Sequence, residues 1–554
     1  MKLSGAESMA KSLQLEGVEV IFGYPGGANI LLYDALIESP IRQILVRHEQ
    51  AAAHAASGYS RVTGKTGVCL ATSGPGATNL ITGIATAYMD SIPLVAITGQ
   101  VPTNLIGRDV FQEVDITGAT DPFTKNNYLV QKAADLPRII REAFHIASTG
   151  RPGPVLIDIP KDVQTEITEY HRPEQVNLRG YKPTVQGHPR QIRKAIESMT
   201  QSQRPVIVVG GGMVSANASA ELVEFAERMQ APVATTLMGI GAFPASHPLF
   251  LGMIGGDHGV YAAKQAVASA DFLVVLGSRM ADRSTGKRDE FAQSVGTVVH
   301  IDVDPAEIGK NIDCHIPIVG DIKKALKQIL ELDFQRDHPE WINQITQWKE
   351  IVGGTGSGDG EKGLDPMHIL QTLSRKASKD TIIVTDVGQH QIWTGRYYGF
   401  ESPRTFLTSG GLGTMGYGLP AAIGAKVGQP DRQVILITGD GSFQMNFPEL
   451  ATAAQEGLCI KIILLNNSRL GMVRELQQYF CDSRYTQTTL RGNPNFSVLA
   501  SAYGFASLQV QASDDYSAAI DSLLESRETI LTDFRIDPNA NVIPMAPQEG
   551  GNEK

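Results

Sequence analysis

Two short motifs in the last third of the chain carry the residue types of a site for a metal ion and a phosphate group. Gly439-Asp440-Gly441 follows the apolar residues 434–437, and Asn466-Asn467 follows the apolar residues 462–465. Apolar runs of this length are typical of buried parallel strands, whose following loops meet at one edge of a sheet and bind ligands there. Glycines allow the backbone to approach a diphosphate, and aspartate and asparagine offer the oxygen ligands that Mg²⁺ prefers. Together the two motifs predict a metal-held diphosphate.

Each candidate also has a simpler interpretation. Gly439-Asp440-Gly441 alone is typical of a turn in which the aspartate caps a helix, and the pairing with Asn466-Asn467 is what favours the metal site. A third candidate, Glu49, opens an alanine-rich stretch and by itself is typical of a solvated side chain in the first turn of a helix. A zinc-protease site at His48-Glu49 is excluded, because the next histidine is His54 and the His-Glu-x-x-His spacing is not met.

Strands and helices must hold these motifs in place. Along the chain, runs of β-branched residues alternate with helical patterns. Such alternation predicts an α/β protein with three doubly wound parallel-sheet domains, of which the first and third share an architecture. We expect the domains at residues 1–165, 190–335 and 365–545, with a linker over residues 169–190 and a glycine-rich boundary at residues 351–360. The expected strands include residues 68–71, 94–97, 205–209, 272–277, 298–302, 382–384, 434–437 and 462–465.

The composition narrows the class of protein. At 554 residues the chain is too long for a single hydrophobic core. Its formal net charge of −10 argues against nucleic acid and anionic membranes as partners, and no apolar run approaches the roughly 20 residues that cross a bilayer. The four cysteines form no CxxC pair, and residues 1–7 lack the pattern of a signal peptide, so we expect a cytoplasmic protein.

The two motifs of the third domain resemble those of the thiamine-diphosphate enzymes, in which Gly-Asp-Gly is followed after a gap by Asn-Asn. The resemblance implies that Asp440, Asn467 and the backbone carbonyl of Arg469 bind Mg²⁺. It extends to residues 47–52 and 71–79 of the first domain, where it implies that Glu49 is the catalytic residue. In such enzymes a carboxyl group bonded to the aminopyrimidine N1′ favours the tautomer that accepts the C2 proton of the cofactor.

Further stretches look like the catalytic subunit of acetohydroxyacid synthase, also called acetolactate synthase, of the biosynthetic FAD-containing branch. These stretches are residues 24–27, 109–113, 150–162, 236–239, 302–311 and 385–390. The resemblance implies decarboxylation of pyruvate on thiamine diphosphate and transfer of the hydroxyethyl group to a second 2-oxo acid. Pyruvate as acceptor gives 2-acetolactate and 2-oxobutyrate gives 2-aceto-2-hydroxybutyrate, on the route to valine, leucine and isoleucine.

The resemblance also implies roles for the remaining site residues. Gln112 and Lys161 join Glu49 as catalytic residues, at a substrate entrance that Phe111 also borders. The residues implied to bind thiamine diphosphate are Tyr24, Pro25, Gly26, Gly74, Pro75, Asn79, Val387, Gly388, Gln389, His390, Gly413, Met415, Gly439, Asp440, Gly441, Ser442 and Met472. Those implied to bind FAD are Arg151, Gly210, Gly211, Gly212, Thr236, Leu237, Met238, Gly277, Arg279, Asp302, Val303, Glu307 and Asp321. Residues 255–258 and 279–283 depart from the family's pattern beside them.

Two kinds of alternative stay open. One is another enzyme of the same superfamily: an FAD-free catabolic acetolactate synthase, a pyruvate oxidase that uses FAD for redox chemistry, or a carboligase for a different oxo acid. The other is a non-catalytic regulatory paralogue, against which the presence of Glu49, Asp440 and Asn467 counts. The resemblance further implies a homodimer or homotetramer, because the first and third domains meet across a subunit interface in this family, and a separate small regulatory subunit.

One departure from the family concerns the acceptor. Leu476 occupies the position at which family members usually carry a tryptophan that lines the acceptor pocket. One extra methylene group on a substrate, bound in an apolar pocket, changes the enzyme's preference between two substrates by about 1–3 kcal/mol. Without the tryptophan ring, the pocket lacks the apolar surface that would contact the extra methyl group of 2-oxobutyrate. We expect a weaker preference for 2-oxobutyrate than is usual in the family, and poor sensitivity to inhibitors that stack on that tryptophan. A competition assay with both acceptors measures the preference, and strong selectivity for 2-oxobutyrate would contradict it.

Overall fold

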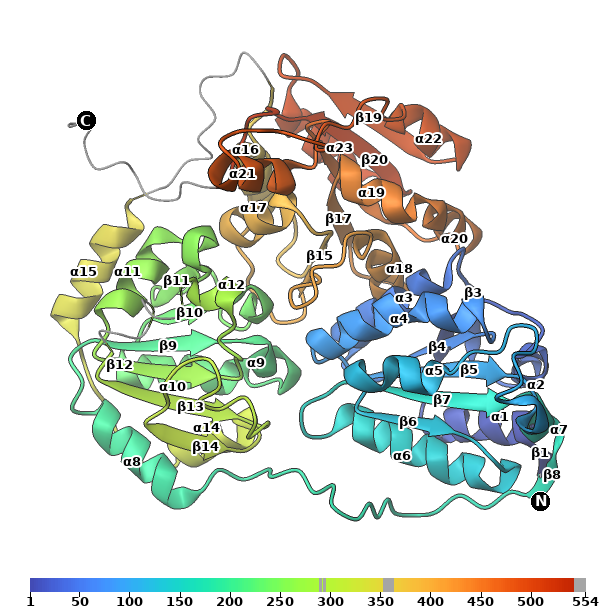
Figure 1. Cartoon of the computed structure of the whole chain (residues 1–554). Helices are drawn as coiled ribbons and strands as arrows, with labels where there is room; N and C mark the ends of the chain where they lie inside the picture. The colour runs from blue at the N-terminus through green and yellow to red at the C-terminus, as the bar shows by residue number, and fades with distance from the viewer. Residues whose placement is uncertain (288–290, 292–294, 352–362, 543–554) are drawn as a thin grey trace.

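The computed structural model describes residues 1–287, 291, 295–351 and 363–542. Three α/β units follow one another along the chain, and each is built on a six-stranded sheet flanked by helices (Figure 1). Every strand pair in these three sheets is parallel, so the predicted fold class is confirmed. Residues 352–360 of the expected glycine-rich boundary and residues 543–545 of the expected third domain lie outside the described residues. The domain limits remain a prediction.

The sheet of the first unit has the order β3-β2-β4-β5-β7-β6. Strands β4 and β5 are buried along their whole length, which explains why their sequences are continuously apolar rather than alternating. The strands are β2 (Val20–Gly23), β3 (Arg42–Leu45), β4 (Gly67–Ala71), β5 (Leu94–Gln100), β6 (Asn126–Leu129) and β7 (Pro154–Pro160). The helices are α1 (Gly5–Leu15), α2 (Ile30–Ile37), α3 (Glu49–Thr63), α4 (Pro75–Met89), α5 (Ile116–Thr120), α6 (Leu136–Ser148) and α7 (Lys161–Thr165). A short antiparallel pair, β1 (Lys2–Ser4) and β8 (Ile167–Glu169), adjoins them.

The sheet of the second unit has the order β11-β10-β9-β12-β13-β14. Counted within the unit, this is the order 3-2-1-4-5-6 of dinucleotide-binding sheets, with the switch in strand order between β9 and β12. The strands are β9 (Pro205–Val209), β10 (Val233–Thr235), β11 (Phe250–Met253), β12 (Phe272–Leu276), β13 (Thr297–Asp302) and β14 (Ile316–Val319). The helices are α8 (Pro189–Met199), α9 (Gly211–Ser215), α10 (Ser219–Met229), α11 (Tyr261–Ser269), α12 (Asp282–Thr285), α14 (Ile322–Leu330) and α15 (Pro339–Lys349).

The sheet of the third unit has the order β16-β15-β17-β18-β20-β19, which counted within the unit repeats the order of the first. The expected likeness of these two units is therefore confirmed at the level of topology. The strands are β15 (Ile382–Thr385), β16 (Phe406–Leu407), β17 (Val434–Gly439), β18 (Lys461–Asn466), β19 (Ala506–Val510) and β20 (Ile530–Arg535). The helices are α16 (Pro366–Lys376), α17 (Gln389–Tyr397), α18 (Gly418–Gly428), α19 (Asp440–Asn446), α20 (Leu450–Gln455), α21 (Gly471–Phe480), α22 (Phe496–Ala502) and α23 (Tyr516–Glu525).

The chain between the first two units is extended, and it runs along one side of the molecule in Figure 1. Residues 170–188 of the predicted linker contain no helix or strand, and α8 begins at Pro189. In the part of the chain that the structure describes, no helix combines the length and the apolar character needed to cross a bilayer.

Helix α3 of the first unit lies beside α18 of the third unit (Figure 1). At their closest points almost no side chain separates the two backbones. A Cβ atom added to Gly424 would lie 1.8 Å from the carbonyl oxygen of Ala55, and one added to Gly58 would lie 2.2 Å from that of Ala421. The small residues of both helices therefore permit a backbone-to-backbone approach. One hydrophobic core runs through this contact and includes side chains of both units.

Replacing Gly424 with alanine is expected to destabilise the protein. The added methyl group would overlap with the backbone of α3, and overpacking of this kind costs about 1–3 kcal/mol. Alanine at an unobstructed glycine whose backbone conformation suits any residue has the opposite effect and stabilises by about 0.4–1 kcal/mol. The midpoint of thermal unfolding measures the change, with Gly27→Ala as control because a Cβ at Gly27 meets no atom within 4 Å. A midpoint for Gly424→Ala that is unchanged or higher would contradict this packing.

Candidate active site

A small cavity of about 60 Å³ lies where the loops after β15, β17 and β18 meet at the carboxyl edge of the third sheet. The strand order switches at β15, because the chain adds β16 on one side of β15 and then crosses over to add β17 on the other. Open α/β sheets bind ligands at such a switch point. Nearly all third-unit residues predicted to hold the diphosphate and the metal ion line this cavity: Val387, Gly388, Gln389, His390, Met415, Gly439, Asp440, Gly441, Ser442, Asn467, Arg469 and Met472. Gly413 does not line it, although a Cβ on Gly413 would lie 4.0 Å from Val387 Cγ1.

Asp440 is the first residue of α19 and is almost fully buried. The N-cap of α19 is Gly439, so the alternative in which Asp440 caps the helix is wrong. Asn493 Nδ2 donates to Asp440 Oδ2 at 2.6 Å, and burial raises the pKa of Asp440 to about 6. Asp440 forms no ion pair with any residue that the structure describes. A buried carboxylate of this kind gains from a divalent cation, which supplies the missing positive charge.

The second motif lies beside the first because β17 and β18 pair in parallel. Asn467 follows the end of β18, and its Oδ1 accepts a hydrogen bond from the Arg469 amide at 3.1 Å. Within the described ranges, no three side chains of the types His, Cys, Asp and Glu are gathered as a metal site. A cation at Asp440 would therefore need side-chain amide or backbone carbonyl oxygens as its further ligands. Asn467 and Arg469 line the same cavity and could supply them.

His390 offers a hydrogen-bond donor for a phosphate oxygen. Its ring is buried, and burial lowers the pKa of His390 to about 3, so the imidazole is neutral. Among the described residues its Nε2 has no hydrogen-bond partner. A Cβ on Gly388 would lie 2.8 Å from His390 Cε1, and one on Gly439 would lie 3.0 Å from His390 Nδ1. In the tautomer protonated at Nε2, this buried nitrogen beside two glycines fits a phosphate group.

Asp386 is a residue of the site that the sequence analysis missed. Its buried carboxylate accepts from the amide of Val387 at 2.8 Å, from that of Gly416 at 2.9 Å and from that of Gly418 at 3.1 Å. It thereby joins the loop after β15 to the loop that carries Met415. Burial raises the pKa of Asp386 to about 6. The only signal in the sequence is an aspartate directly after an apolar strand.

Glu475 is a second residue that the sequence analysis missed. It lies on α21 with only 1% of its surface exposed. Gln389 Nε2 donates to its carboxylate at 2.8 Å, and the Val542 amide donates to the same carboxylate at 2.9 Å. Glu475 therefore connects a residue that lines the cavity to the backbone far along the chain. Nothing in the local sequence distinguishes it from a surface glutamate on an amphipathic helix.

Residues 538–542, which we call the C-terminal segment, are fastened to side chains that line the cavity. Arg469 Nη1 donates to the carbonyl oxygen of Pro538 at 2.7 Å, and Gln389 Nε2 donates to that of Ala540 at 3.0 Å. The side chain of Arg469 is thus occupied by the C-terminal segment. Residues that line the cavity are therefore held by the backbone of residues 538–542, which lies outside the Gly-Asp-Gly and Asn-Asn motifs.

Glu49 is the first residue of α3, and its carboxylate lies against the first turns of α4. Asn79 Nδ2 on α4 donates to Glu49 Oε2 at 2.9 Å, and a Cβ on Gly76 would lie 3.3 Å from Glu49 Oε1. The loop after β2 is close by, because a Cβ on Gly26 would lie 2.7 Å from Thr72 in the loop after β4. Tyr24, Pro25, Gly26, Gly74 and Pro75 belong to these two loops or to the helix starts that follow them.

The three residues predicted at the substrate entrance lie at or near the surface of the first unit. A Cβ on Gly74 would lie 2.9 Å from the Cα atom of Gln112, so Gln112 adjoins the loop after β4. Lys161 is exposed at the start of α7, and Phe111 is 87% exposed. No described residue of the first unit lines the third-unit cavity. Within one chain, then, Glu49 and Asp440 do not face a common cavity.

A larger cavity of about 460 Å³ lies between the three units, within the size range of about 300–1,000 Å³ that is usual for cofactor sites. Twelve of the residues predicted to bind FAD line it: Arg151, Gly211, Gly212, Thr236, Leu237, Met238, Gly277, Arg279, Asp302, Val303, Glu307 and Asp321. Gly210 does not line it, and a Cβ there would lie 2.3 Å from the carbonyl oxygen of Gly277. Asp90 of the first unit and Gly411 of the third complete the wall.

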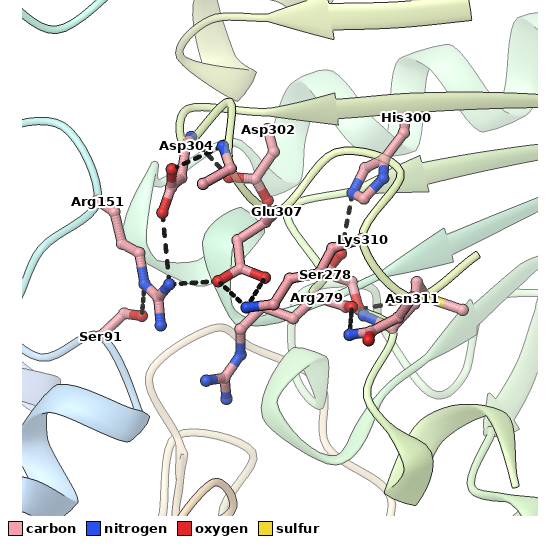
Figure 2. Close-up of polar contacts among 12 residues, drawn as sticks. Ser91, Arg151, Ser278, Arg279, His300, Asp302, Asp304, Glu307, Lys310 and Asn311 are labelled. Carbon is pink, nitrogen blue, oxygen red and sulfur yellow. Dashed lines mark hydrogen bonds and ion pairs between the residues drawn. The ribbon is translucent and has the colours of Figure 1, made fainter. Parts of the chain in front are cut away.

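Acidic side chains, two arginines and Lys310 gather at one end of this larger cavity (Figure 2). Arg151, which comes from the first unit, lies 2.6 Å from Glu307 and 3.4 Å from Asp304, and its Nε donates to the Ser91 hydroxyl at 2.9 Å. Burial raises the pKa of Asp302, at the end of β13, to about 6. Carboxylates at strand ends suit ribose hydroxyl groups, and an arginine suits a diphosphate.

Comparison with known protein families matches all three units. The description "Thiamine pyrophosphate enzyme, N-terminal TPP binding domain" matches residues 3–119, the central domain of the same enzymes matches residues 192–329, and their C-terminal TPP binding domain matches residues 386–534. A probable acetolactate synthase large subunit of Methanocaldococcus jannaschii is 48% identical, over 99% of this chain and 94% of its own length. The chain belongs to the acetolactate synthase family.

Other members of the acetolactate synthase family are similar to the same extent. The acetolactate synthase of Arthrospira platensis is 47% identical over 98% of this chain and 96% of its own length. The acetolactate synthase large subunit of Corynebacterium glutamicum is 46% identical over 100% of this chain and 90% of its own length. The N-terminal match contains Glu49 and Asn79, and the C-terminal match contains Asp440 and Asn467, so both candidate groups fall in domains described as binding thiamine pyrophosphate.

The Glu475→Leu variant is expected to loosen the C-terminal segment. Leucine has no acceptor for Gln389 Nε2 or for the Val542 amide, which both bind Glu475 Oε2, and an unsatisfied buried polar group costs about 1–3 kcal/mol. Limited proteolysis after residue 537 and the midpoint of thermal unfolding measure the change. Glu525→Leu, at an exposed position of α23, is the control. Equal proteolysis rates in the two variants would contradict the role of Glu475.

Proposed function

We propose that this chain is an acetolactate synthase that decarboxylates pyruvate and joins the hydroxyethyl group to a second 2-oxo acid, in the biosynthesis of branched-chain amino acids. The observation that carries the proposal is the cavity in which Asp440, Asn467 and the neutral His390 meet at the carboxyl ends of paired strands. Relatives of nearly equal length that are named acetolactate synthase support the same reaction. Pyruvate and 2-oxobutyrate are the proposed acceptors.

Thiamine diphosphate, when bound, supplies the nucleophilic carbon and accepts the electron pair that remains after CO₂ leaves. Asp440, Asn467 and the carbonyl of Arg469 would hold Mg²⁺ against the diphosphate, and His390 would donate to a phosphate oxygen. Glu49 would keep a proton at the aminopyrimidine N1′, and Asn79, which donates to Glu49, would fix the direction of its carboxyl group.

We place FAD in the larger cavity between the units. The strand order of the second unit, the glycine turns after β9 and β12, and the carboxylates of Asp302 and Glu307 support a dinucleotide there. Arg151 and Arg279 would face its diphosphate. Because Arg151 belongs to the first unit, a flavin in this cavity would join the first and second units of the chain.

We further propose a homodimer or homotetramer in which Glu49 of one copy serves the metal cavity of another. The proposal is supported by the absence of any described first-unit residue from that cavity. Exposed apolar side chains nearby on α21, Val473, Leu476 and Phe480, are 45%, 42% and 81% exposed and would be covered in such an assembly. A small regulatory subunit is proposed because several relatives are named large subunits.

Turnover of pyruvate to acetolactate, with and without FAD, thiamine diphosphate and Mg²⁺, tests the proposal. We expect turnover to need thiamine diphosphate and Mg²⁺, and Glu49→Gln to lower kcat by about 10²–10⁴-fold, the usual contribution of an acid–base group. The flavin absorption spectrum should stay oxidised during turnover.

Other outcomes would identify the alternatives. Reduction of the flavin by pyruvate would indicate a pyruvate oxidase, and full activity without flavin would indicate the catabolic synthase. Failure to bind thiamine diphosphate would overturn the proposal in favour of a non-catalytic paralogue.

A further inference from the structure

The carboxylate of Glu449 reaches from the third unit to the backbone of the first. Glu449 lies directly before α20, at the end of the 3₁₀ turn η6 (Phe447–Glu449), and only 1% of its surface is exposed. Its Oε1 accepts from the Arg47 amide at 2.8 Å and from the His48 amide at 3.0 Å. Its Oε2 accepts from the Thr452 hydroxyl at 2.6 Å. Both oxygens are therefore occupied, and the side chain has one defined orientation.

The two amides that Glu449 binds belong to the residues immediately before Glu49. His48 is the N-cap of α3, with extended backbone dihedrals, and its Nδ1 accepts from the Gln50 amide at 3.1 Å. The residues before a helix determine where the helix begins and in which direction its first side chains leave. A carboxylate at this end of α3 also stabilises the positive end of the helix dipole. Glu449 thus fixes the point from which the Glu49 side chain leaves the backbone.

Other contacts also join the residues before α3 to the third unit. Arg47 Nη2 donates to Gln455 Oε1 at 2.9 Å, and the Thr452 hydroxyl oxygen lies 3.3 Å from the Leu45 carbonyl oxygen. Arg42 and Glu456 form an ion pair at 2.7 Å further along the same edge. The ion pair is partly exposed and touches none of residues 47–49, whereas Glu449 is buried and binds two of them. Glu456 is therefore a matched control.

We propose that Glu449 is a positioning residue for Glu49: it holds the backbone amides of Arg47 and His48 so that the Glu49 carboxyl group meets the aminopyrimidine of thiamine diphosphate. The inference rests on the proposed function, which gives Glu49 its role. Glu449 does not touch the reacting atoms.

Glu449 also lies close in the sequence to the metal motif at Asp440. Helix α19 begins with the metal motif at Asp440 and ends at Asn446, and η6 with Glu449 follows at once. In the proposed dimer, Asp440 of a chain serves one site and Glu49 of the same chain serves the other. The short segment from Asp440 to Glu449, which consists of α19 and η6, would then connect the two sites of the dimer.

The experiment compares Glu449→Leu, Glu449→Asp and Glu449→Gln with Glu456→Gln and the unaltered full chain. Leucine removes the acceptor, aspartate keeps the charge but withdraws it by one methylene, and glutamine keeps an oxygen that both amides can reach. The first measurement is hydrogen exchange of the Arg47 and His48 amides in the protein without cofactor. The second is the near-ultraviolet circular dichroism of bound thiamine diphosphate, which reports the tautomer of the aminopyrimidine and needs no turnover. Glu49→Gln supplies the reference spectrum.

We expect Glu449→Leu and Glu449→Asp to exchange both amides at least tenfold faster and to shift the spectrum toward that of Glu49→Gln. Their kcat should fall by about 10²-fold, the order of loss that a displacement of 1 Å causes, while KM for pyruvate changes little. Glu449→Gln should restore most of the exchange protection and activity, and Glu456→Gln should match the unaltered chain.

Protected amides together with an unaltered spectrum in Glu449→Asp would overturn the proposal, even if Glu449→Leu fails to fold. Equal effects in Glu449→Asp and Glu456→Gln would also overturn it, because they would indicate a general loss of contact between the units. Without pyruvate turnover in the unaltered chain, the proposed function fails, and amide exchange and the cofactor spectrum still decide whether Glu449 positions Glu49.

Discussion

The close approach of α3 and α18 is the contact on which the rest of this structure depends. Side chains cannot mediate it at its tightest points, since Gly58 and Gly424 each face a carbonyl oxygen of the other helix. Two helices in this contact have a fixed separation and little freedom to slide, because protein interiors are packed as densely as crystals. The first residue of α3 is Glu49, so the position of that carboxylate is determined by a helix of a different unit.

Buried carboxylates hold the loops of the two candidate sites, and each is compensated in its own way. Asp386 is surrounded by backbone amides, Asp440 has an asparagine, and Glu307 has an arginine from the first unit. Burial of a charge without such partners is costly. The loops therefore do not depend on apolar packing alone, and the glycines among them leave room for a ligand that brings charge of its own.

The parts that could be predicted from the sequence are those with a local signal. Buried parallel strands such as β4 and β17 are continuous apolar runs, and the loops after them carry glycines. These local patterns are sufficient to predict the fold class and most of the residues that line the third-unit cavity. Asp386, Glu475 and Glu449 were not, because their partners are defined by the tertiary fold. Glu475 binds Gln389, 86 positions away, and Glu449 binds Arg47, 402 positions away. A glutamate that binds a distant backbone amide looks like any other glutamate in the sequence.

The C-terminal segment has a consequence for how the protein is made. Synthesis on the ribosome produces Asp440 and Asn467 well before residues 538–542, yet the side chains of Gln389, Arg469 and Glu475 each bind backbone groups of that later segment. Domains generally fold as units as they leave the ribosome, and the first unit can do so early. The third-unit cavity cannot gain these contacts until Val542 has emerged from the exit tunnel. A nascent chain that stalls between β20 and Val542 would thus carry every motif of the site and still lack the backbone that holds Gln389 and Glu475 in place.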